Sequence, residues 1–300
     1  MNPSLADFLK THLPQYENDI HESFSLQRLN TWRVGGSAEC LFEPRSIQAI
    51  TDVFKILPDV PITWLGLGSN VLLSDSGMPG LVIVTQGGLS QLSHDGALFF
   101  AEAGVPCAKL ARYAARQGFE KGEFFAGIPG TVGGALAMNA GAFGSETWLH
   151  VADVMCINRQ GECIRRTPQD FQISYRKALG HPNEWFVSAQ FRLQVGDTHV
   201  AQEKIRALLA QRKETQPTGE HTCGSVFKNP PGNYAGKLIE ACGLKGYAIG
   251  DAVVSPKHAN FIVNQGKARA EDIVQLIQYI QQTVYEQAGV RLEPEVKIME

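Results

Sequence analysis

Three residues of this chain carry side chains suited to acid–base or anion chemistry in apolar surroundings: Arg176, Ser225 and Glu295. The planar guanidinium of Arg176 fits a carboxylate, and burying it without an anion would be costly. Ser225 lies between Gly224 and an apolar segment, where a hydroxyl could be held rigidly, and Glu295 follows Pro294, where it could face a cleft. Each residue has a structural alternative. For Arg176, a structural ion pair is as well supported as a role in anion binding. For Ser225 taken alone, a hydrogen bond to the backbone is favoured. For Glu295 taken alone, an exposed position on an edge strand is favoured.

The main binding stretch is glycine-rich and covers residues 127–144. It holds six glycines and almost no charge, so an anion there would be bound by backbone N–H groups. Thr131 and Asn139 add side-chain hydrogen bonds. This composition argues against an ordinary amphipathic helix and favours a ligand cradle over a glycine-rich surface loop.

A second glycine cluster, Gly66-Leu-Gly68-Ser69-Asn70, follows a predicted strand. A dinucleotide fingerprint would need a third glycine and a helix, and residues 71–74 do not suit a helix, which excludes a Rossmann site. The turn can present N–H and hydroxyl groups to a phosphate. A plain hairpin turn is an equal alternative.

Composition narrows the functional class. The 300 residues are 44% hydrophobic with a net charge of −3, which indicates a globular protein without the basic footprint of a nucleic-acid partner. No apolar run is long enough to cross a membrane, and residues 1–15 resemble an amphipathic helix more than a signal peptide. The six cysteines form no Cys-x-x-Cys pair, so we expect reduced thiols, a cytoplasmic location and no metal site.

Apolar periodicity and turn residues predict the elements that position these groups. The expected helices cover residues 47–57 with Ser46 as N-cap, 105–117, 200–213, 235–242 and 269–288. The expected strands cover residues 37–43, 61–65, 81–84, 97–103 and 185–195, a hairpin of 151–157 with 161–166, a strand from residue 224, one within 257–264 and a final strand over 290–299.

Nine segments together resemble one enzyme family. In chain order they are residues 30–36, 66–73, 127–135, 139–144, 174–176, 224–230, 235–240, 257–264 and 292–296. Their combination, over roughly residues 25–298, resembles the UDP-N-acetylenolpyruvoylglucosamine reductase (MurB) family of peptidoglycan synthesis. The short separation of Arg176 and Ser225 resembles its compact type, which lacks an extra substrate-covering loop. Two departures are Asp251, where a glycine is usual, and Met299-Glu300, where Ile-Gly is usual.

The resemblance implies an α+β fold. It consists of an FAD-binding domain of the vanillyl-alcohol-oxidase (PCMH) type in two subdomains and a smaller α+β substrate-binding domain. Because the composition changes after Gly196, we expect an N-terminal helical segment at 1–24, the FAD-binding domain at 25–196 and the substrate-binding domain at 197–300.

The resemblance also implies the chemistry. FAD would be bound non-covalently and NADPH would be the reductant. The reaction would convert UDP-N-acetyl-3-O-(1-carboxyvinyl)-glucosamine to UDP-N-acetylmuramate, serving wall biogenesis, cell shape, the cell cycle and division. Arg176, assisted by Glu295, would stabilise the enolate, and Ser225 would protonate its C2.

The same resemblance assigns the remaining contacts, with no required protein partner. Substrate contacts are expected at Tyr175, Lys213 and Asn229. FAD contacts are expected at Thr31, Gly66, Gly68, Ser69, Asn70, Gly130, Thr131, Gly133, Gly134, Asn139, Gly141 and Ala142.

Two alternatives remain open at this point. One is a sugar or alcohol oxidase of the same flavin fold that passes electrons to oxygen; such oxidases often anchor FAD through His or Cys. The other is a non-catalytic flavin-binding or scaffold protein, which would not need Arg176, Ser225 and Glu295 together.

Overall fold

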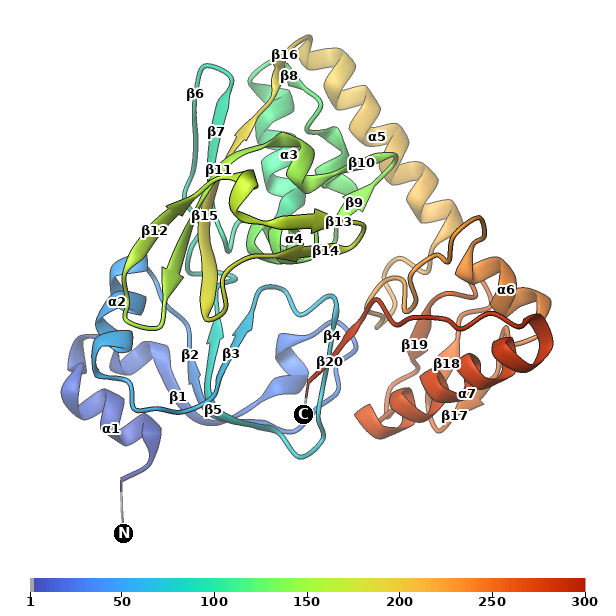
Figure 1. The fold of residues 1–300 in the computed structure, drawn as a ribbon, viewed down its shortest axis with the longest axis horizontal. Coiled ribbons are helices and arrows are strands. Elements are labelled where there is room, and N and C mark those ends of the chain that lie inside the picture. Colours follow the sequence, from blue (N-terminus) through green and yellow to red (C-terminus); the bar gives the residue numbers. More distant parts are fainter. Residues whose placement is uncertain (1–2, 300) are drawn as a thin grey trace. The chain divides into compact units, whose positions relative to one another are not determined.

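The computed structural model describes residues 3–299. Two compact units are interleaved along the chain, and Figure 1 labels their helices and strands. Unit 1 contains Met1–Ser23, Glu39–Leu67 and Pro79–Gln211, and unit 2 contains Phe24–Ala38, Gly68–Met78 and Arg212–Glu300. The three continuous domains expected from the sequence, at 1–24, 25–196 and 197–300, are a different division of the chain from these two interleaved units. Those domain boundaries stay predictions. Among residues 3–299, no helix has the length and apolar character needed to cross a membrane.

A four-stranded sheet with the order β1-β2-β5-β3 lies mainly in unit 1. Its strands are β1 (Ile20–Ser25), β2 (Ser37–Phe42), β5 (Met78–Val84) and β3 (Ile62–Leu65), and β3 runs parallel to β5. Helix α2 (Ile47–Ile56) connects β2 to β3, which confirms the helix predicted at 47–57 and the strands predicted at 37–43 and 61–65. The Ser46 hydroxyl accepts a hydrogen bond from Ala49 N at 3.2 Å, as expected of an N-cap. Helix α1 (Leu5–His12) packs with this region through Ala6 and Leu9.

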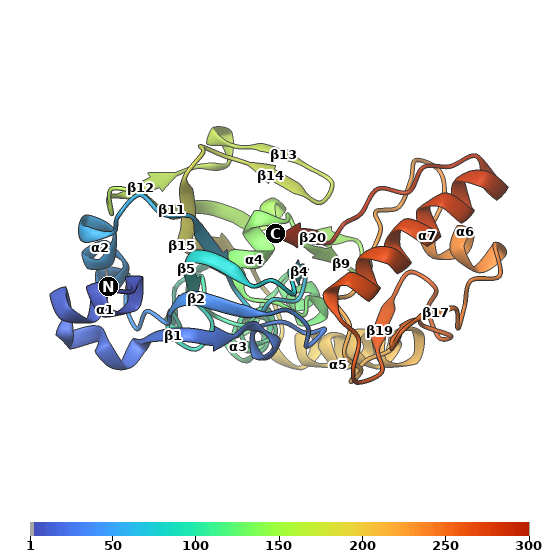
Figure 2. The same ribbon diagram turned by 90° about the horizontal axis from the view of Figure 1, so that it is seen from below.

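The second sheet of unit 1 has five strands in the order β12-β11-β15-β7-β6, all antiparallel. Figure 1 labels all five, and Figure 2 shows β12, β11 and β15 from below. The strands are β11 (Val151–Asn158), β12 (Cys163–Arg166), β15 (Glu184–Arg192), β7 (Leu98–Glu102) and β6 (Leu92–Asp95). The predicted hairpin at 151–166 is thus confirmed. The predicted strand 185–195 is divided, because β16 (Gln194–Val195) leaves this sheet and pairs with β8 (Phe119–Glu120).

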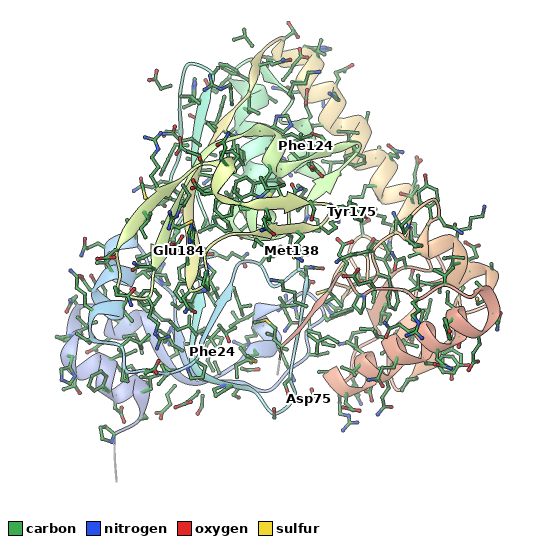
Figure 3. The ribbon with its side chains drawn as sticks, in the orientation of Figure 1. Phe24, Asp75, Phe124, Met138, Tyr175 and Glu184 are labelled. Atoms are coloured by element: carbon green, nitrogen blue, oxygen red, sulfur yellow. The ribbon has the colours of Figure 1, made fainter. Side chains whose placement is uncertain are left out.

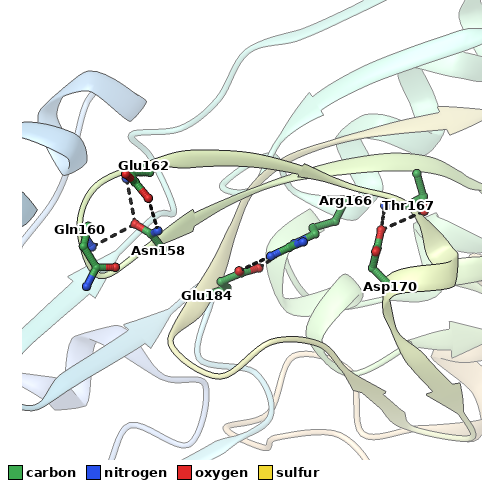
Figure 4. Close-up of polar contacts among 7 residues, drawn as sticks. All are labelled: Asn158, Gln160, Glu162, Arg166, Thr167, Asp170 and Glu184. Atoms are coloured by element: carbon green, nitrogen blue, oxygen red, sulfur yellow. Dashed lines mark hydrogen bonds and ion pairs between the residues drawn. The ribbon is translucent and has the colours of Figure 1, made fainter.

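Polar contacts hold the β11–β12 hairpin and its neighbours (Figure 4). The Asn158 side-chain oxygen accepts hydrogen bonds from Gln160 N at 3.0 Å and Glu162 N at 2.9 Å, which closes the turn. Arg166 donates from two nitrogens to Glu184, at 3.1 and 2.6 Å. This pair bridges β12 and β15 across the intervening β11.

Helices cover the second sheet and form the largest core with it. They are α3 (Cys107–Arg116), α4 (Val132–Ala137) and η3 (Glu123–Gly127). Further short elements of unit 1 are η1 (Pro14–Asp19), η4 (Thr147–His150), η5 (Pro168–Asp170), β9 (Gly141–Ala142), β10 (Ser145–Glu146), β13 (Gln172–Ser174) and β14 (Lys177–Leu179). The glycine-rich stretch, which was expected not to form an ordinary amphipathic helix, contains the short helix α4, which was not predicted. Its Val132, Ala135 and Leu136 are buried on one side despite the two glycines between them.

Unit 2 consists of a three-stranded sheet, two helices and a parallel strand pair. The sheet order is β17 (Ala248–Ile249), β18 (Ala252–Val254) and β19 (Ile262–Asn264). The helices are α6 (Ala235–Ala241) and α7 (Ala270–Ala288), and β4 (Val71–Leu73) pairs with β20 (Lys297–Met299). The unit also contains η2 (Leu26–Leu29), and α5 (Thr198–Thr215) carries residues of both units.

A loop distant in sequence caps the long helix α7. The carboxylate of Asp75, labelled in Figure 3, accepts hydrogen bonds from Ala270 N and Glu271 N, both at 3.0 Å. These are N–H groups of the first helical turn, which otherwise lack partners within the helix, and a negative charge is favourable there. Asp75 therefore ties the loop after β4 to the start of α7.

Two predicted strands of unit 2 are corrected. No strand begins at residue 224, and the final strand is β20 alone rather than residues 290–299. Between the two segments only an isolated bridge forms, at Phe227 and Pro294. Proline has no N–H for a ladder, and Pro230 and Pro231 follow on the other segment, so pairing ends after one bridge.

Candidate active site

In unit 1, Arg176 lies at the turn of a small hairpin. Ser174 pairs with Lys177, which leaves Tyr175 and Arg176 as the two loop residues. Arg176 has a left-handed φ of 55° and donates from Nη2 to Gly141 O at 3.2 Å. Its Cζ lies 5.3 Å from the centroid of the Tyr175 ring (Tyr175 is labelled in Figure 3). The hairpin is mostly exposed and Arg176 half-buried, which corrects the expectation of a segment suited to burial.

Asn139 connects this hairpin to the glycine-rich stretch. Its side chain donates from Nδ2 to Ser174 O at 3.1 Å and accepts at Oδ1 from Trp148 N at 3.2 Å. The residue is 0% exposed, so its side chain presents no surface to a ligand. Asn139 therefore holds the strand that leads into Arg176, and the cofactor contact expected of it stays a prediction.

In unit 1 the backbone of Gly66 lies close to the side chain of Thr131. A Cβ added at Gly66 would lie 2.2 Å from Thr131 Oγ1, so no side chain fits there without displacing the threonine. Thr131 is 1% exposed, and its Oγ1 has no hydrogen-bond partner among residues 3–299. A buried hydroxyl without a partner is costly unless a ligand or water completes it, so this atom fits a missing ligand.

The other glycines predicted to bind the cofactor in unit 1 lie along the chain from this contact. Gly130 directly precedes Thr131, Gly133 and Gly134 lie in the first turn of α4, and Gly141 and Ala142 form β9. At Gly133 a Cβ would lie 2.9 Å from the Ala103 Cβ, so this backbone also approaches its neighbour closely.

In unit 2, Ser225 and Glu295 lie on hydrogen-bonded neighbouring segments. The carbonyl of Val226, the residue after Ser225, accepts from Glu295 N at 2.7 Å. Both side chains are half-buried. The side-chain amide of Asn70 donates from Nδ2 to the backbone carbonyl of Glu295 at 3.0 Å. The backbone carbonyl of Asn70 accepts from Lys297 N at 3.1 Å. The structure thus brings the backbone segments that carry Ser225 and Glu295 together with Asn70.

Thr31 and Gly68 are held together beside a buried thiol. Thr31 N donates to Gly68 O at 3.1 Å, and Thr31 Oγ1 lies 3.4 Å from Cys223 Sγ. The thiol donates to Val71 O at 3.3 Å. Burial raises the pKa of Cys223 to about 11, so it remains a protonated donor at neutral pH.

Gly68 needs its lack of a side chain. It has a φ of 67°, and a Cβ there would lie 2.0 Å from Leu29 O. Ser69 follows it directly in the turn before β4. The turn therefore joins the segment of Thr31 closely, which the sequence spacing did not indicate.

The two remaining substrate candidates lie in unit 2. Lys213 is exposed near the end of α5, and its carbonyl accepts from Lys257 Nζ at 2.6 Å. The Asn229 side-chain oxygen accepts from Ala235 N at 3.0 Å at the start of α6. Asn229 therefore has a helix-capping contact in addition to the substrate contact expected of it, which stays a prediction.

Two further sequence questions concern Asp251 and metal binding. The Asp251 carboxylate accepts from Lys267 N at 2.9 Å, and among the described residues Asp251 is not one of those with positive φ, so this backbone does not require a glycine. Within residues 3–299, no group of three or more His, Cys, Asp or Glu side chains is placed to hold a metal ion.

Two protein-family models match the chain. The model described as UDP-N-acetylenolpyruvoylglucosamine reductase, C-terminal domain, matches residues 216–299. The model described as FAD binding domain matches residues 38–167. The first range contains Ser225 and Glu295, and the second contains Gly66 and Thr131.

Individual relatives match nearly the whole chain. A UDP-N-acetylenolpyruvoylglucosamine reductase of Alkalilimnicola ehrlichii is 51% identical over 275 residues, covering 91% of this chain and 92% of that protein. The enzyme of that name from Coxiella burnetii is 47% identical over 311 residues, covering 97% of this chain and 98% of that protein. A crystal structure of UDP-N-acetylenolpyruvylglucosamine reductase from Thermus caldophilus aligns with a TM-score of 0.81 at 32% identity, covering 94% of this chain and 98% of that one.

Proposed function

Because the chain belongs to the UDP-N-acetylenolpyruvoylglucosamine reductase family, we propose that it uses FAD and NADPH to reduce UDP-N-acetyl-3-O-(1-carboxyvinyl)-glucosamine to UDP-N-acetylmuramate. The observation that carries the proposal is the 51% identity to a curated reductase over 91% of this chain. The α+β fold with a PCMH-type FAD-binding domain and a smaller C-terminal domain is confirmed by the same comparisons. The oxidase alternative is not favoured.

The residues present fit FAD. In unit 1 the buried Thr131 hydroxyl has no hydrogen-bond partner among residues 3–299, and the backbone beside it at Gly66 has no room for a side chain. In unit 2 the turn at Gly68 and Ser69 offers backbone N–H groups next to Thr31. We assign these groups to non-covalent FAD binding. When bound, FAD supplies the transfer of hydride from NADPH to the enolpyruvyl carbon.

The chain's own residues handle charge and protons. Arg176, whose guanidinium is oriented by Gly141 O and the Tyr175 ring, stabilises the negative charge that develops on the substrate's carboxylate and C2. Ser225 donates a proton to C2. Glu295 supports the enolic form of the substrate, and its backbone is held on both sides, by Val226 O and by the Asn70 amide. A non-catalytic scaffold protein would not need Arg176, Ser225 and Glu295 together.

The finer biological setting is part of the proposal. We place the reaction in the cytoplasm and in the cell cycle, since wall precursors limit growth and division. All six cysteines are free thiols, which supports a reducing compartment. The partners are the UDP-sugar and NADPH, without a required protein partner, nucleic acid or membrane.

The first prediction is that the purified protein is yellow and contains FAD that denaturation releases. Under anaerobic conditions, NADPH should bleach the flavin absorbance and the enolpyruvyl UDP-sugar should restore it. Absorbance spectra and analysis of the released flavin measure both. Flavin that stays attached to the denatured chain, or restoration only by oxygen, would contradict the proposal in favour of an oxidase.

The second prediction concerns Gly66→Ala. The added methyl meets Thr131 Oγ1, so we expect a lower FAD content and a destabilisation of about 1–3 kcal/mol, the usual cost of overpacking. Adding Thr131→Ala removes the oxygen, and so should restore the apo-protein's stability but not the lost hydrogen bond to FAD. Chemical unfolding and FAD titration separate the two effects. Equal FAD affinity in Thr131→Ala and the native protein would exclude Thr131 from the cofactor site.

A further inference from the structure

The side chain of Asn260 is bound to the segment that follows Ser225. Its Oδ1 accepts from Phe227 N at 3.0 Å, and its Nδ2 donates to Phe227 O at 2.8 Å. The backbone carbonyl of Asn260 accepts from Val226 N at 2.9 Å. Asn260 is 4% exposed and Phe227 is 1% exposed, so these bonds are shielded from water.

The opposite edge of the same segment holds Glu295. Val226 O accepts from Glu295 N at 2.7 Å, and Lys228 N donates to Glu293 O at 2.9 Å. The short segment of residues 226–228 therefore lies between Asn260 and the segment of Glu295. It belongs to no strand, so Asn260 supplies the hydrogen bonds that a neighbouring strand would otherwise make.

Asn260 is itself fixed. Its backbone N donates to His258 Nδ1 at 3.2 Å. Burial lowers the pKa of His258, which keeps the ring neutral and this nitrogen able to accept. The His258 ring packs on Phe261, with ring centroids 4.8 Å apart. We call the three hydrogen bonds from Asn260 to Val226 and Phe227 the clamp. The contacts of His258 therefore anchor the clamp to the turn before β19.

We propose that Asn260 is a positioning residue that sets the place of the Ser225 hydroxyl relative to Glu295. Ser225 precedes the clamped residues directly, and Gly224 before it has a left-handed φ of 75°. Val226 is joined to Ser225 by its peptide bond and to Glu295 by its carbonyl oxygen, which accepts from Glu295 N. Movement of Val226 and Phe227 therefore shifts both groups at once. This inference rests on the proposed function.

The test is Asn260→Asp. The carboxylate keeps an acceptor for Phe227 N but loses the donor to Phe227 O and repels that oxygen. In the holoenzyme we expect the single-turnover rate of flavin reoxidation by the enolpyruvyl substrate to fall about 10- to 100-fold, the order that a misplacement near 1 Å costs. The dissociation constant of the substrate, the FAD content and the rate of reduction by NADPH should be nearly unchanged.

Asn264→Asp is the matched control. Asn264 is 3% exposed, and its side chain makes three bonds to backbone groups, one more than that of Asn260: it donates to Trp32 O at 2.8 Å and accepts from Gly266 N at 2.8 Å and Ala268 N at 3.1 Å. Like Asn260→Asp, this control variant loses a side-chain donor to a backbone carbonyl, and it lies in the same unit. Its reoxidation rate per bound flavin should equal that of the native protein. Equal slowing in both variants would make Asn260 merely structural.

A second comparison tests whether Asn260 acts through Ser225. Added to Ser225→Ala, Asn260→Asp should slow reoxidation little further, since the group it positions is gone. Full additivity would overturn the proposal. If Asn260→Asp does not fold, Asn260→Ser replaces it in the same cycle. A native protein that is reduced by NADPH but not reoxidised by the enolpyruvyl sugar would instead refute the proposed function.

The positioning role has a readout that needs no turnover. In amide hydrogen exchange, Asn260→Asp should speed exchange at Val226, Phe227 and Glu295, while Asn264→Asp should leave these three amides unchanged. Unchanged exchange in Asn260→Asp would overturn the clamp, whatever the substrate proves to be.

Discussion

Replacing Ser225 by alanine is expected to slow the reoxidation of flavin by the enolpyruvyl substrate by about 10²- to 10⁴-fold, the usual contribution of a general acid. The reason is that C2 of the substrate then has no positioned proton donor. Reduction of the flavin by NADPH needs no such donor and should keep its rate. Alanine leaves the backbone in place, including the bond between Val226 O and Glu295 N. Stopped-flow absorbance measures the two half-reactions separately.

A matched serine provides the control. Ser46 caps α2 in unit 1, where its hydroxyl accepts from Ala49 N at 3.2 Å. Ser46→Ala should destabilise the fold by about 0.5–2 kcal/mol, as the loss of an N-cap does, without changing either half-reaction. Reoxidation at the native rate in Ser225→Ala would remove Ser225 from the mechanism and leave its hydroxyl with a structural role.

Local patterns explain why most helices and several strands could be predicted. Residues 269–288 were expected as a helix and α7 covers Ala270–Ala288, because its apolar stripe recurs every three or four residues and a glycine follows. In α2, the Ser46 cap marked the start in the same way. Both signals depend only on neighbours along the chain, so one sequence is enough to interpret them.

The sequence-based predictions are wrong where residues far away in the chain determine the local structure. Glu295 was assigned to a strand, but its backbone is held by Val226 and by Asn70, which is 225 positions away. The cap of α7 comes from Asp75, 195 positions before Ala270. Helix α4 was missed because Gly133 and Gly134 have low helix propensity, which tertiary burial of Leu136 overrides. Periodicity carries no information about such long-range partners.

The same distinction between local patterns and long-range partners applies to the candidate site. The residue types at Arg176, Ser225 and Glu295 were recognisable because their ordered motifs resemble one family. Their supporting groups were not recognisable. Asn139 and Asn260 look like ordinary polar residues until their amides are seen on the segments that carry Arg176 and Ser225. A buried side-chain amide that replaces a strand partner has no sequence signature of its own.

The largest loss after Ser225→Ala is expected from changing Arg176 and Glu295 together. Arg176→Lys keeps the charge but loses the planar fork that fits a carboxylate, so we expect slower reoxidation rather than a neutral change. Glu295→Gln keeps the shape but removes the charge or proton of the carboxyl group. If both serve the same enolate, the double variant should lose much less than the product of the single losses, since groups that work as one unit are strongly non-additive.

A second arginine–glutamate pair in the same chain supplies the control cycle. Arg166 and Glu184 form a two-pronged ion pair in unit 1 (Figure 4). Arg166→Lys and Glu184→Gln should couple in the free energy of unfolding but leave single-turnover reoxidation unchanged. The Arg176 and Glu295 variants should show the reverse: coupling in reoxidation, with FAD content and reduction by NADPH nearly intact. Additive kinetic losses would mean that the two residues serve separate steps, and a fall in FAD content would mean that Arg176 acts by holding the hairpin to Gly141 rather than by stabilising charge.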